Sequence, residues 1–487
     1  MRLKDLLHRV TILNSIGSLD KEIGGITYDS RSITSDGLFI AVSGFKVDGH
    51  AYIGEAIARG AAAVVTEKEC MLAYQEGTTA IMVEDSRVAM ATIAANFYQS
   101  PSRELGVIGI TGTNGKTSTS YFTQQILEKL DSKIGVIGTL GIQLGDKKLP
   151  ISITTVTTPE AIELQQTFRE MADAGAKRCV MEVSSHSLAL ERVGDIRFRH
   201  AVFTNLTQDH LDFHHTMEEY FLEKKKLFKR TDGKCIINCD DPYGRQLFEE
   251  CKTEACSFGL HGEWNLRAEN LELGIRGSSF DLIVYGQRAR VETKLLGEFA
   301  IYNLLAAAAI AYHEGMDFDA ICKAIPQVKG ICGRFELVET PADYSVVIDY
   351  AHSPDGVDKV IQAARAITKG RVITVFGCGG DRDQTKRPIM GRIASEGSDL
   401  VVITSDNMRT EDPLFIISQI EEGISPDRQN YICQPDRTKA VDEALGLAEK
   451  NDLILLLGKG HERYQIIGNK KIPMDERKIV QAYFEKE

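Results

Sequence analysis

The sequence predicts an α/β protein of three domains, the second and third of which are parallel sheets covered by helices. Three observations lead to this prediction. The chain has 487 residues, about the length of three ordinary domains. Short apolar runs of strand length alternate with helical segments over most of the chain, a pattern typical of parallel sheets. One of these strands is separated from the helix after it by a glycine-rich loop.

Composition excludes several classes of protein. The 57 basic and 69 acidic residues give a net charge of −12 with no basic block, which argues against nucleic-acid binding. The longest apolar stretch, 299–312, contains Asn303 and is too short to span a bilayer. The N-terminus lacks the unbroken apolar core of a signal peptide, so we expect a cytoplasmic protein without membrane insertion. The ten cysteines include no CxxC pair and are expected to be reduced thiols.

The first domain, predicted over residues 1–102, mixes short strands and helices. Strands are predicted at 26–33 (ITYDSRSI), 37–44 (GLFIAVSG) and 61–67 (AAAVVTE), with a helix at 52–60 (YIGEAIARG). Pro101 and the serines on either side of it interrupt this pattern and mark the end of the domain.

The second domain is predicted over residues 103–332 and the third over 333–487. Strands of the second are expected at 105–110, 133–140, 178–184, 200–206 and 234–240. Strands of the third are expected at 344–350, 371–380, 400–406 and 452–460, each ending in a turn rich in Gly or Asp. The third domain is therefore expected to be Rossmann-like, and ligands of such sheets bind at the carboxyl ends of the strands.

The strongest motif is GITGTNGKTSTS, residues 109–120, between the strand at 105–110 and a helix beginning near 120. Backbone N–H groups at such a helix start can cradle a triphosphate, so a P-loop NTPase-like domain that binds ATP is expected. Lys116 would meet the β- and γ-phosphates, and Thr117 would bind Mg²⁺. Ile110 stands where the common pattern has Gly, so the loop is a variant; the alternative is a plain glycine-rich turn. The expected ATP-binding residues of the loop are Gly112, Thr113, Asn114, Gly115, Lys116, Thr117 and Ser118.

Two polar residues follow other strands of this sheet. Glu182 ends the strand at 178–184, and His210 comes after the strand at 200–206. Either residue alone would more often be structural or solvated. Together, at strand ends of a P-loop sheet, they favour a site for divalent metal. His214 and His215 lack such support and are expected on the surface.

At this point the chain resembles the Mur ligases. The resemblance rests on TGTNGKTS, MEVSSH, FTNLTQDHLDFH, the Asn303 segment, GRFE, DYAHSPD, FGCGGDRDQTKRP and GKGHERYQ, and it runs from about residue 27 to 477. It is closest to the branch that adds the third stem-peptide amino acid to UDP-N-acetylmuramoyl-L-alanyl-D-glutamate. It implies that ATP phosphorylates the substrate carboxylate and that an incoming amine attacks the acyl phosphate, with Mg²⁺ as cofactor.

The resemblance also implies roles for individual residues. Thr117 and Glu182 match ligands of a first Mg²⁺, and His210 matches a ligand of a second. Among Lys224–Lys226, the family spacing from Tyr220 and to Phe228 selects Lys224 as a carbamylated lysine (N6-carboxylysine); without the resemblance, three consecutive lysines would be a solvated helix face. The implied catalytic residues are Lys116, Lys224 and His210.

Binding residues are implied in the same way. The nucleotide is expected to meet Asn303, Arg334 and Asp349. The UDP-substrate is expected to meet Tyr28, Ser30, Thr157, Thr158, Ser184 and Arg192, with Phe45–Val47 beside the uridine diphosphate. Leu190 stands where related enzymes can carry Gln, so one polar substrate contact is expected to be missing or replaced.

The amino acid to be added is expected to bind Arg382, Asp406, Asn407, Met408, Arg409, Gly458 and Glu462. Family members that add meso-diaminopimelate carry Asp-Asn-Pro-Arg where this chain has Asp-Asn-Met-Arg. The distal carboxylate of diaminopimelate suits the Arg409 guanidinium, and its distal ammonium suits Glu462. Met408 replaces the usual Pro and its fixed φ, which leaves the loop shape open.

Three alternatives remain. The chain could add L-lysine instead, if Arg409 is only a surface residue paired with Glu411 or Asp412. It could be another enzyme of the superfamily, such as a folylpolyglutamate synthase or the D-glutamate-adding ligase, although the TYDSR and DNMR segments argue against both. It could be a non-catalytic nucleotide-binding homologue, although the intact Lys116, Glu182, His210 and Lys224 argue against that. We expect a monomer whose partners are small-molecule substrates.

Overall fold

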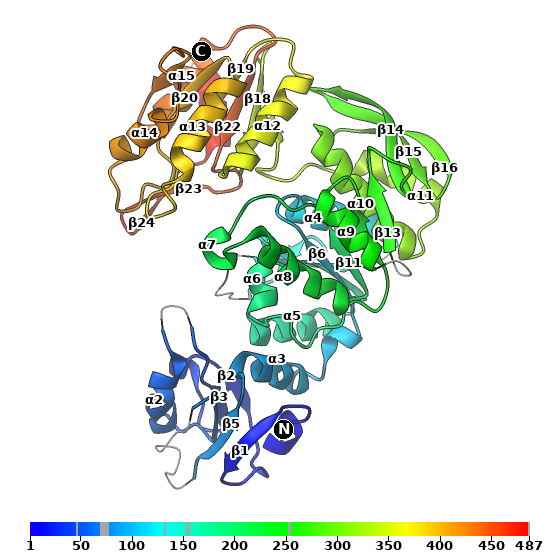
Figure 1. Ribbon diagram of the computed structural model, residues 1–487, viewed down its shortest axis with the longest axis vertical. Coiled ribbons are helices and arrows are strands. Elements are labelled where there is room, and N and C mark those ends of the chain that lie inside the picture. The colour runs from blue at the N-terminus through cyan, green and yellow to red at the C-terminus, as the bar shows by residue number, and fades with distance from the viewer. Residues whose placement is uncertain are drawn as a thin grey trace.

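The computed structural model describes residues 1–44, 47–68, 77–130, 133–151, 155, 157–251 and 255–485. The chain forms three α/β units that follow one another along the long axis of the molecule (Figure 1). Each unit is built around its own sheet, so the predicted α/β class with three domains is confirmed. The predicted domain limits at residues 102 and 332 stay predictions. No helix among the described residues is long and apolar enough to cross a membrane.

The N-terminal unit has a five-stranded sheet of order β1-β5-β4-β3-β2, in which only β1 runs antiparallel to its neighbour. The predicted strand at 26–33 stops at Thr27, because the Asp29 carboxylate accepts a hydrogen bond from the Arg31 N–H and starts a 3₁₀ turn. The elements are α1 (Leu3–Leu6), β1 (Ile12–Ile16), β2 (Gly25–Thr27), β3 (Gly37–Ile40), α2 (Ile53–Ala58), β4 (Ala63–Thr66), β5 (Thr79–Val83) and α3 (Ser86–Phe97).

The central unit has an eleven-stranded sheet of order β16-β15-β14-β13-β12-β11-β6-β10-β7-β8-β9. Its strands are β6 (Gly106–Thr111), β7 (Ile134–Gly138), β8 (Gly141–Leu144), β9 (Lys147–Lys148), β10 (Arg178–Glu182), β11 (His200–Phe203), β12 (Cys235–Asn238), β13 (Ala255–Gly259), β14 (Leu266–Gly274), β15 (Gly277–Val284) and β16 (Gln287–Thr293). Its helices are α4 (Lys116–Leu127), α5 (Ala161–Asp173), α6 (Ser185–Ala189), α7 (Leu211–His214), α8 (Met217–Lys229), α9 (Pro242–Glu250), α10 (Glu298–His313) and α11 (Phe318–Ala324).

The middle of this sheet is parallel, as predicted, but both of its ends are antiparallel. The predicted parallel sheet is therefore the middle of the observed one, and antiparallel strands extend it at both ends. Tyr285 and Gly286 both have positive φ and join β15 to β16 in a two-residue turn, the geometry that favours a hairpin over a crossover. Leu273 and Ile275, at the turn between β14 and β15, pack against the hydrophobic core of the C-terminal unit.

Helix α10 is buried along most of its length because it is rich in alanine and leucine. Four consecutive alanines, 306–309, are completely buried, and their small side chains let α10 pack closely against α4. This packing brings Asn303 of α10 to the start of α4, beside the glycine-rich loop.

The C-terminal unit has a six-stranded sheet of order β17-β18-β22-β19-β20-β21, in which only β17 is antiparallel. Its elements are β17 (Glu336–Val338), β18 (Ser345–Asp349), α12 (Pro354–Ile367), β19 (Val372–Phe376), α13 (Lys386–Gly397), β20 (Leu400–Ile403), α14 (Pro413–Glu421), β21 (Tyr431–Cys433), α15 (Arg437–Leu447), β22 (Leu453–Leu457), β23 (Tyr464–Ile467), β24 (Lys470–Pro473) and α16 (Glu476–Glu485).

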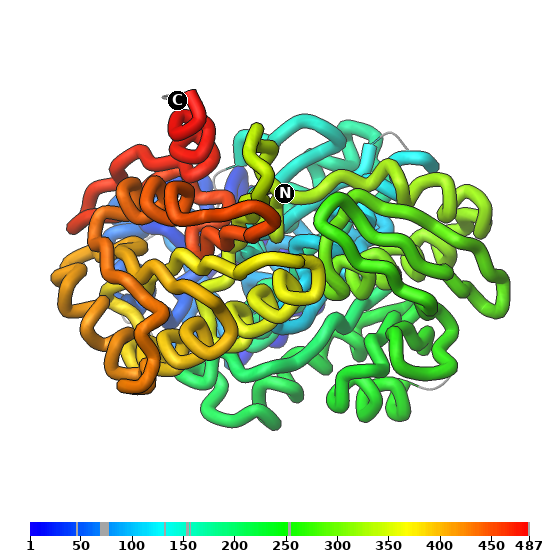
Figure 2. Tube along the Cα trace, turned by 90° about the horizontal axis from the view of Figure 1, so that it is seen from above, coloured from blue at the N-terminus to red at the C-terminus, as the bar shows by residue number. Residues whose placement is uncertain are grey.

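The parallel strands place the loops after β18, β22, β19 and β20 at one edge of this sheet. A separate two-stranded ribbon, β23–β24, lies beside these loops. Viewed from above, the C-terminal unit lies on one side of the molecule and strands β14–β16 on the other (Figure 2).

Candidate active site

The loop between β6 and α4 has the backbone of an anion-binding loop. Gly112 and Gly115 have φ values of 150° and 85°, conformations that side chains disfavour. A Cβ on Gly115 would lie 2.5 Å from Oδ1 of Asn303, and one on Gly112 would collide with the Thr204 hydroxyl. Lys116 opens α4, and its Nζ donates to the carbonyl oxygens of Gly112 and Thr113 at 2.9 and 2.8 Å.

Side chains and neighbouring segments hold the rest of the loop. The Thr113 hydroxyl donates to the Thr207 carbonyl at 3.1 Å, and the Asn114 N–H donates to Oδ1 of Asn205 at 2.9 Å. The Asn114 side chain donates to Asp355 of the C-terminal unit at 2.9 Å. The loop is thus shaped before any phosphate binds, which keeps its N–H groups oriented.

Strands β10 and β11 flank β6 on either side, so their carboxyl ends meet at the glycine-rich loop. Glu182 is the last residue of β10 and pairs in register with Ile110 of β6. Its side chain is buried and accepts hydrogen bonds from the N–H and hydroxyl of Thr139 at 2.9 and 3.1 Å. Among the described residues, no cation forms a salt bridge with this carboxylate. A buried carboxylate of this kind can take a metal ion.

Lys224 does not lie on a solvated face of α8. It is 1% exposed, and its Nζ donates to the Gly112 carbonyl at 2.9 Å and lies 4.5 Å from the centre of the Tyr220 ring. Burial, and then the nearby Lys116 cation, hold the pKa of Lys224 well below its ordinary value. The side chain is therefore disposed to be a neutral amine, the form that reacts as a nucleophile.

His210 precedes α7 and has a positive φ of 55°. Its ring centre lies 4.9 Å from that of His186 and 6.2 Å from that of Tyr220. Burial is the largest effect on its pKa, which is lowered, and a neutral imidazole is the form that binds metal.

His214, expected on the surface, is instead 4% exposed. Its ring stacks on Tyr220 with centres 5.0 Å apart, and its Nε2 lies 2.8 Å from the Ser185 hydroxyl. The surface prediction for His214 is therefore wrong, because helix α8 covers it; His215 is exposed as predicted.

No three His, Cys, Asp or Glu side chains among the described residues converge on a metal position. Thr117 is buried, and its hydroxyl lies 3.4 Å from a guanidinium nitrogen of Arg334. One carboxylate and one hydroxyl beside a phosphate-binding loop fit Mg²⁺, which keeps several waters and takes further oxygens from substrate phosphates.

A cavity of about 790 Å³ opens between α4, α10 and the segment from 326 to 339. Ser118, Asn303 and Arg334 line it, together with apolar residues such as Phe122 and Phe299. Asn303 accepts a hydrogen bond from the Thr119 hydroxyl at 3.1 Å, and the Arg334 guanidinium lies 4.8 Å from the Tyr350 ring centre. The size, the apolar walls and the few polar groups suit a nucleotide base beside the phosphate loop.

Asp349 ends β18 and is 8% exposed. Its two oxygens accept the N–H groups of Phe335 and Ala351, each at 2.7 Å. Burial raises the pKa of Asp349, and the Arg334 charge and these two hydrogen bonds partly oppose this rise. In this structure Asp349 therefore braces the segment that carries Arg334.

The residues expected to meet the UDP-substrate fall into two groups. Tyr28 and Ser30 belong to the N-terminal unit; the Tyr28 hydroxyl donates to Glu163 of α5, and the Ser30 hydroxyl donates to Glu55 at 2.9 Å. Phe45 and Lys46 lie outside the described residues, and the side chain of Val47 is exposed.

The second group gathers beside Glu182 in the central unit. The Thr158 hydroxyl donates to the Glu182 carbonyl at 2.9 Å and lies 3.4 Å from the Ser184 hydroxyl. Arg192 donates to the Thr158 carbonyl at 3.2 Å and pairs with Glu160 at 2.8 Å. Thr157 lies 3.4 Å from the Thr139 hydroxyl, and Leu190 follows α6. These side chains lie around the end of β10, which pairs with β6 just before the glycine-rich loop.

The residues expected to bind the amino acid come from three loops at the carboxyl edge of the C-terminal sheet. Arg382 follows β19 and is exposed; Asp406–Arg409 follow β20; Gly458 and Glu462 follow β22. Arg409 has a φ of 51°, and its guanidinium donates to the Gly380 carbonyl at 2.7 Å. Met408 packs against the core of the unit, and Gly458, with a φ of 104°, lets Asp406 approach closely.

Two buried ionic groups support these loops and were not predicted. The Lys459 ammonium donates to Glu462 at 2.6 Å and to Asn407 at 2.8 Å. The buried Arg387 guanidinium donates to both oxygens of Glu411 at 2.8 and 2.9 Å. Lys459 lies within the GKGHE motif, between two predicted residues, so its position along the chain was a usable signal. Arg387 lies within the FGCGGDRDQTKRP segment, but nothing there indicated Glu411 as its partner.

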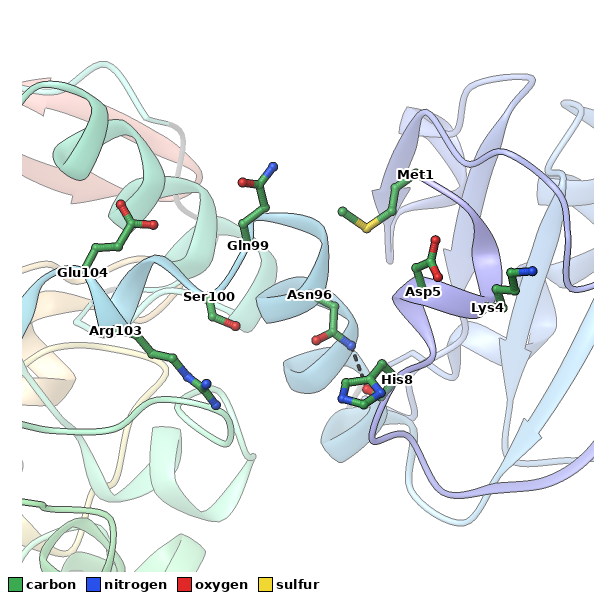
Figure 3. A pocket seen from close by; sticks show the side chains of 9 residues that line it. All are labelled: Met1, Lys4, Asp5, His8, Asn96, Gln99, Ser100, Arg103 and Glu104. Atoms are coloured by element: carbon green, nitrogen blue, oxygen red, sulfur yellow. Dashed lines mark hydrogen bonds between the residues drawn. The ribbon is translucent and has the colours of Figure 1, made fainter.

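Another cavity, of about 580 Å³, lies away from the phosphate loop, between the N-terminal helix and the end of α3 (Figure 3). It is lined by Met1, Lys4, Asp5, His8, Asn96, Gln99, Ser100, Arg103 and Glu104. None of the predicted site residues lines it, and several of its charges are paired: Lys4 with Asp20, Asp5 with Arg2, and Glu104 with Arg169.

Comparison with known families gives three matches that together span most of the chain. Residues 22–98 match the Mur ligase family catalytic domain, residues 110–311 the Mur ligase middle domain, and residues 333–460 the Mur ligase glutamate ligase domain.

Individual relatives are similar over their whole length. The chain is 45% identical to UDP-N-acetylmuramoyl-L-alanyl-D-glutamate--2,6-diaminopimelate ligase 1 of Clostridium acetobutylicum, covering 99% of both chains. It is 46% identical to the corresponding ligase of Caldanaerobacter subterraneus subsp. tengcongensis, over 99% of this chain and 98% of the relative. A solved structure of a UDP-N-acetylmuramoyl-L-alanyl-D-glutamate--2,6-diaminopimelate ligase matches with a TM-score of 0.72 and 28% identity, covering 100% and 99% of the two chains.

Proposed function

The chain belongs to the Mur ligase family, and on that premise we propose that it is the ATP-dependent ligase that joins meso-diaminopimelate to UDP-N-acetylmuramoyl-L-alanyl-D-glutamate in peptidoglycan precursor synthesis. The observation that carries this proposal is a pair of sites, each at the carboxyl edge of one of two sheets. One holds a phosphate loop with the half-buried Lys116 and the buried Lys224, and the other holds an arginine beside an acidic pocket. Relatives with this activity in their names align over nearly the whole chain.

The reaction has two steps. The terminal carboxylate of the dipeptide substrate attacks the γ-phosphorus of ATP, which gives an acyl phosphate and ADP. The amine of diaminopimelate then attacks the acyl carbon, forms the amide and releases phosphate. Both steps bring anions together, so the protein must position the reactants and neutralise charge.

Residues of the central unit supply this neutralisation. We propose that Lys116 exchanges its two carbonyl partners for β- and γ-phosphate oxygens, and that the N–H groups at the start of α4, from Gly115 to Ser118, hold the remaining phosphate oxygens. Asn303, Arg334 and Asp349 are proposed to bind or position the nucleoside, because two of them line the cavity and the third braces Arg334.

The donor set also suits Mg²⁺. Thr117 and Glu182 would hold one ion and His210 a second, and the ions would offset phosphate charge when ATP is bound. The support is the buried Glu182 carboxylate beside the loop and the neutral form favoured for His210.

Lys224 is proposed to be carbamylated. Its neutral amine can attack CO₂ and lose one proton, and the resulting N6-carboxylysine carries a negative charge that can help hold metal. Burial and the low pKa of the amine support this proposal. The same carbamate would place a negative charge near the Lys116 ammonium, and the two opposite charges would attract each other.

Roles are also proposed for the residues that would bind the UDP-substrate and the amino acid. Tyr28 and Ser30 are proposed to bind the uridine diphosphate end, and Thr157, Thr158, Ser184 and Arg192 the muramoyl-dipeptide. In the third domain, Arg409, with Arg382 and Asn407, is proposed to bind the distal carboxylate of diaminopimelate. Asp406, Met408, Gly458 and Glu462 complete that pocket.

We also propose that the enzyme works as a cytoplasmic monomer, with domain limits at residues 102 and 332. The cysteines among the described residues are free thiols, as a reducing compartment requires, and ATP and UDP-linked substrates are found there.

The direct test is phosphate release with ATP, the UDP-dipeptide and meso-diaminopimelate present together. We expect release to require all three and to accompany formation of the UDP-tripeptide. Phosphate release with L-lysine but not diaminopimelate would favour the lysine-adding alternative. ATP binding without any turnover would favour a non-catalytic homologue.

A further inference from the structure

A buried cation beside the proposed amino-acid pocket has no role in the reaction described above. The side chain of Lys459, in the loop after β22, is 0% exposed. Its ammonium lies 2.6 Å from Glu462, 2.8 Å from the Asn407 side-chain oxygen and 3.4 Å from Asp406. A buried ammonium is costly unless it is paired, and here two hydrogen bonds, to Glu462 and Asn407, and the ion pair with Asp406 pair it.

These contacts extend to the arginine expected to read the distal carboxylate. The Asn407 oxygen that Lys459 holds also accepts the Ile466 N–H at 2.8 Å. The Ile466 carbonyl in turn accepts the Arg409 N–H at 3.0 Å, and the Arg409 carbonyl accepts the Gly468 N–H at 2.7 Å. Lys459 therefore fixes the Asn407 side chain. That side chain in turn holds strand β23, whose Ile466 contacts the backbone of Arg409.

Charge gives Lys459 a second role. Asp406 and Glu462 bring two negative charges to one pocket, and Lys459 offsets one of them. One net negative charge remains on this group of three side chains, and the proposed pocket's arginines, Arg409 and the exposed Arg382, supply positive charge. The distal end of diaminopimelate carries one ammonium and one carboxylate, which matches that balance. L-lysine carries only the ammonium, and a pocket with both carboxylates uncompensated would attract it more strongly.

We propose that Lys459 is a positioning residue that sets amino-acid specificity, by holding Asn407 and Glu462 and by cancelling one negative charge that would otherwise favour L-lysine. The inference rests on the proposed diaminopimelate-ligase function. It concerns a residue that does not touch the substrate, so it predicts a change in selectivity rather than in ATP use.

The test compares kcat/KM for meso-diaminopimelate and L-lysine in the full-length enzyme. In the ratio of these two kcat/KM values, the effects of contacts to the parts that both amino acids share cancel. Lys459→Gln keeps a hydrogen-bond donor but removes the charge. We expect it to lower the ratio at least about tenfold, the effect of one unit charge several ångströms away at an effective dielectric constant of about 20, with the KM for ATP unchanged.

Two further variants keep the proposal falsifiable. Asp406→Asn has the same shape and removes a negative charge, so the ratio should move the opposite way and rise. Arg371→Gln is the matched control: Arg371 pairs with the buried Asp452 at 2.8 Å, at the opposite edge of the same sheet. It should lose stability without changing the ratio.

The inference is overturned if Lys459→Gln leaves the ratio within twofold of wild type, or if both pocket variants move it in the same direction. Should Lys459→Gln not fold, Asp406→Asn decides alone: a higher ratio supports the proposal, and an unchanged or lower one overturns it. A wild-type enzyme that does not use diaminopimelate would instead contradict the proposed function itself.

Discussion

The phosphate loop of the central sheet and the amino-acid pocket of the C-terminal sheet use the same architecture, since both lie at the carboxyl edge of parallel strands. They differ in how the chain builds them. A single segment, residues 109–118, forms most of the phosphate loop. The ammonium groups of Lys116 and Lys224 donate to backbone carbonyls of this segment. The amino-acid pocket is built from several loops between residues 379 and 462. Ion pairs formed by buried cations hold these loops in place.

This difference has a chemical reason. Phosphate is recognised by successive N–H groups, and these require only one continuous turn at a helix start. The distal end of an amino acid presents two opposite charges a short distance apart, and separate loops must converge to meet both. The comparison predicts that variants at the phosphate loop abolish chemistry, whereas variants in the pocket change which amino acid is used.

The largest effect is expected at Lys224. Lys224→Arg keeps a cation where the proposed carbamate would place a negative charge, so ligation should fall below detection. Lys224→Ala should also be inactive but should regain activity with added short carboxylic acids, which can occupy the vacated space. Phosphate release measures both. A fully active Lys224→Arg enzyme would rule out the carbamate.

Lys116→Ala should reduce kcat by about 10²- to 10³-fold, the typical cost of removing one preorganised electrostatic contact to a transition state. Binding of the UDP-substrate should survive, because the N-terminal unit folds around its own sheet. Turnover and equilibrium binding of the UDP-substrate would be measured on the same preparation. Near-normal turnover would contradict the phosphate-loop assignment.

Arg409→Ala should raise the KM for diaminopimelate by about ten- to a hundredfold, because the distal carboxylate would lose its charged hydrogen-bond partner, which is worth about 1.5–3 kcal/mol. The KM values for ATP and the UDP-substrate should change little. Thr410→Ala is a suitable control, since Thr410 is exposed next to Arg409 and bonds only Asp381 among the described residues. An unchanged preference in Arg409→Ala would remove the basis for the specificity assignment.

The smallest effect on activity is expected at the opposite edge of the central sheet. Glu314 is buried there, 2.5 Å from Arg178, 2.6 Å from Arg199 and 3.0 Å from His200. Burial would raise the pKa of Glu314, but these partners hold it at about 2. Glu314→Gln should leave turnover near wild type and lower the free energy of unfolding at pH 7 by about 3 kcal/mol.

The pH dependence of that difference has a definite sign. Because the folded-state pKa is depressed, the contribution of Glu314 is complete above its ordinary value of 4.5 and is lost as the pH falls toward 2. Urea unfolding of wild type and Glu314→Gln should therefore converge on acidification. A gap that stays constant between pH 7 and pH 3 would show that the carboxylate charge is not what stabilises this edge.

The two regions also differ in what sequence could predict. The strand, loop and helix around Lys116 are neighbours in the chain, so local pattern was sufficient. Asn303 required the family resemblance, because only the packing of α10 on α4 brings it to the loop. Lys224 looked like one of three solvated lysines, and His214 like a surface residue, since burial by α8 depends on contacts that are distant in sequence.

Other features of the structure were not predicted. The hairpins of β14–β16 replaced an expected parallel continuation because the Tyr285–Gly286 turn favours antiparallel pairing. The Arg387–Glu411 pair joins the start of α13 to the loop after β20, 24 residues further along the chain. Arg387 lies in the FGCGGDRDQTKRP segment, but nothing there indicates its partner. The pocket of the third domain was therefore predicted as a set of residues but not as an ionic network.

The central claim is that this enzyme selects diaminopimelate for ligation through the pocket around Arg409. The most direct measurement is a competition in one reaction, with ATP, the UDP-dipeptide and equal concentrations of meso-diaminopimelate and L-lysine, in which mass spectrometry separates products that differ by one carboxyl group. We predict that the diaminopimelate product exceeds the lysine product by at least about tenfold. Equal amounts, or an excess of the lysine product, would contradict the account.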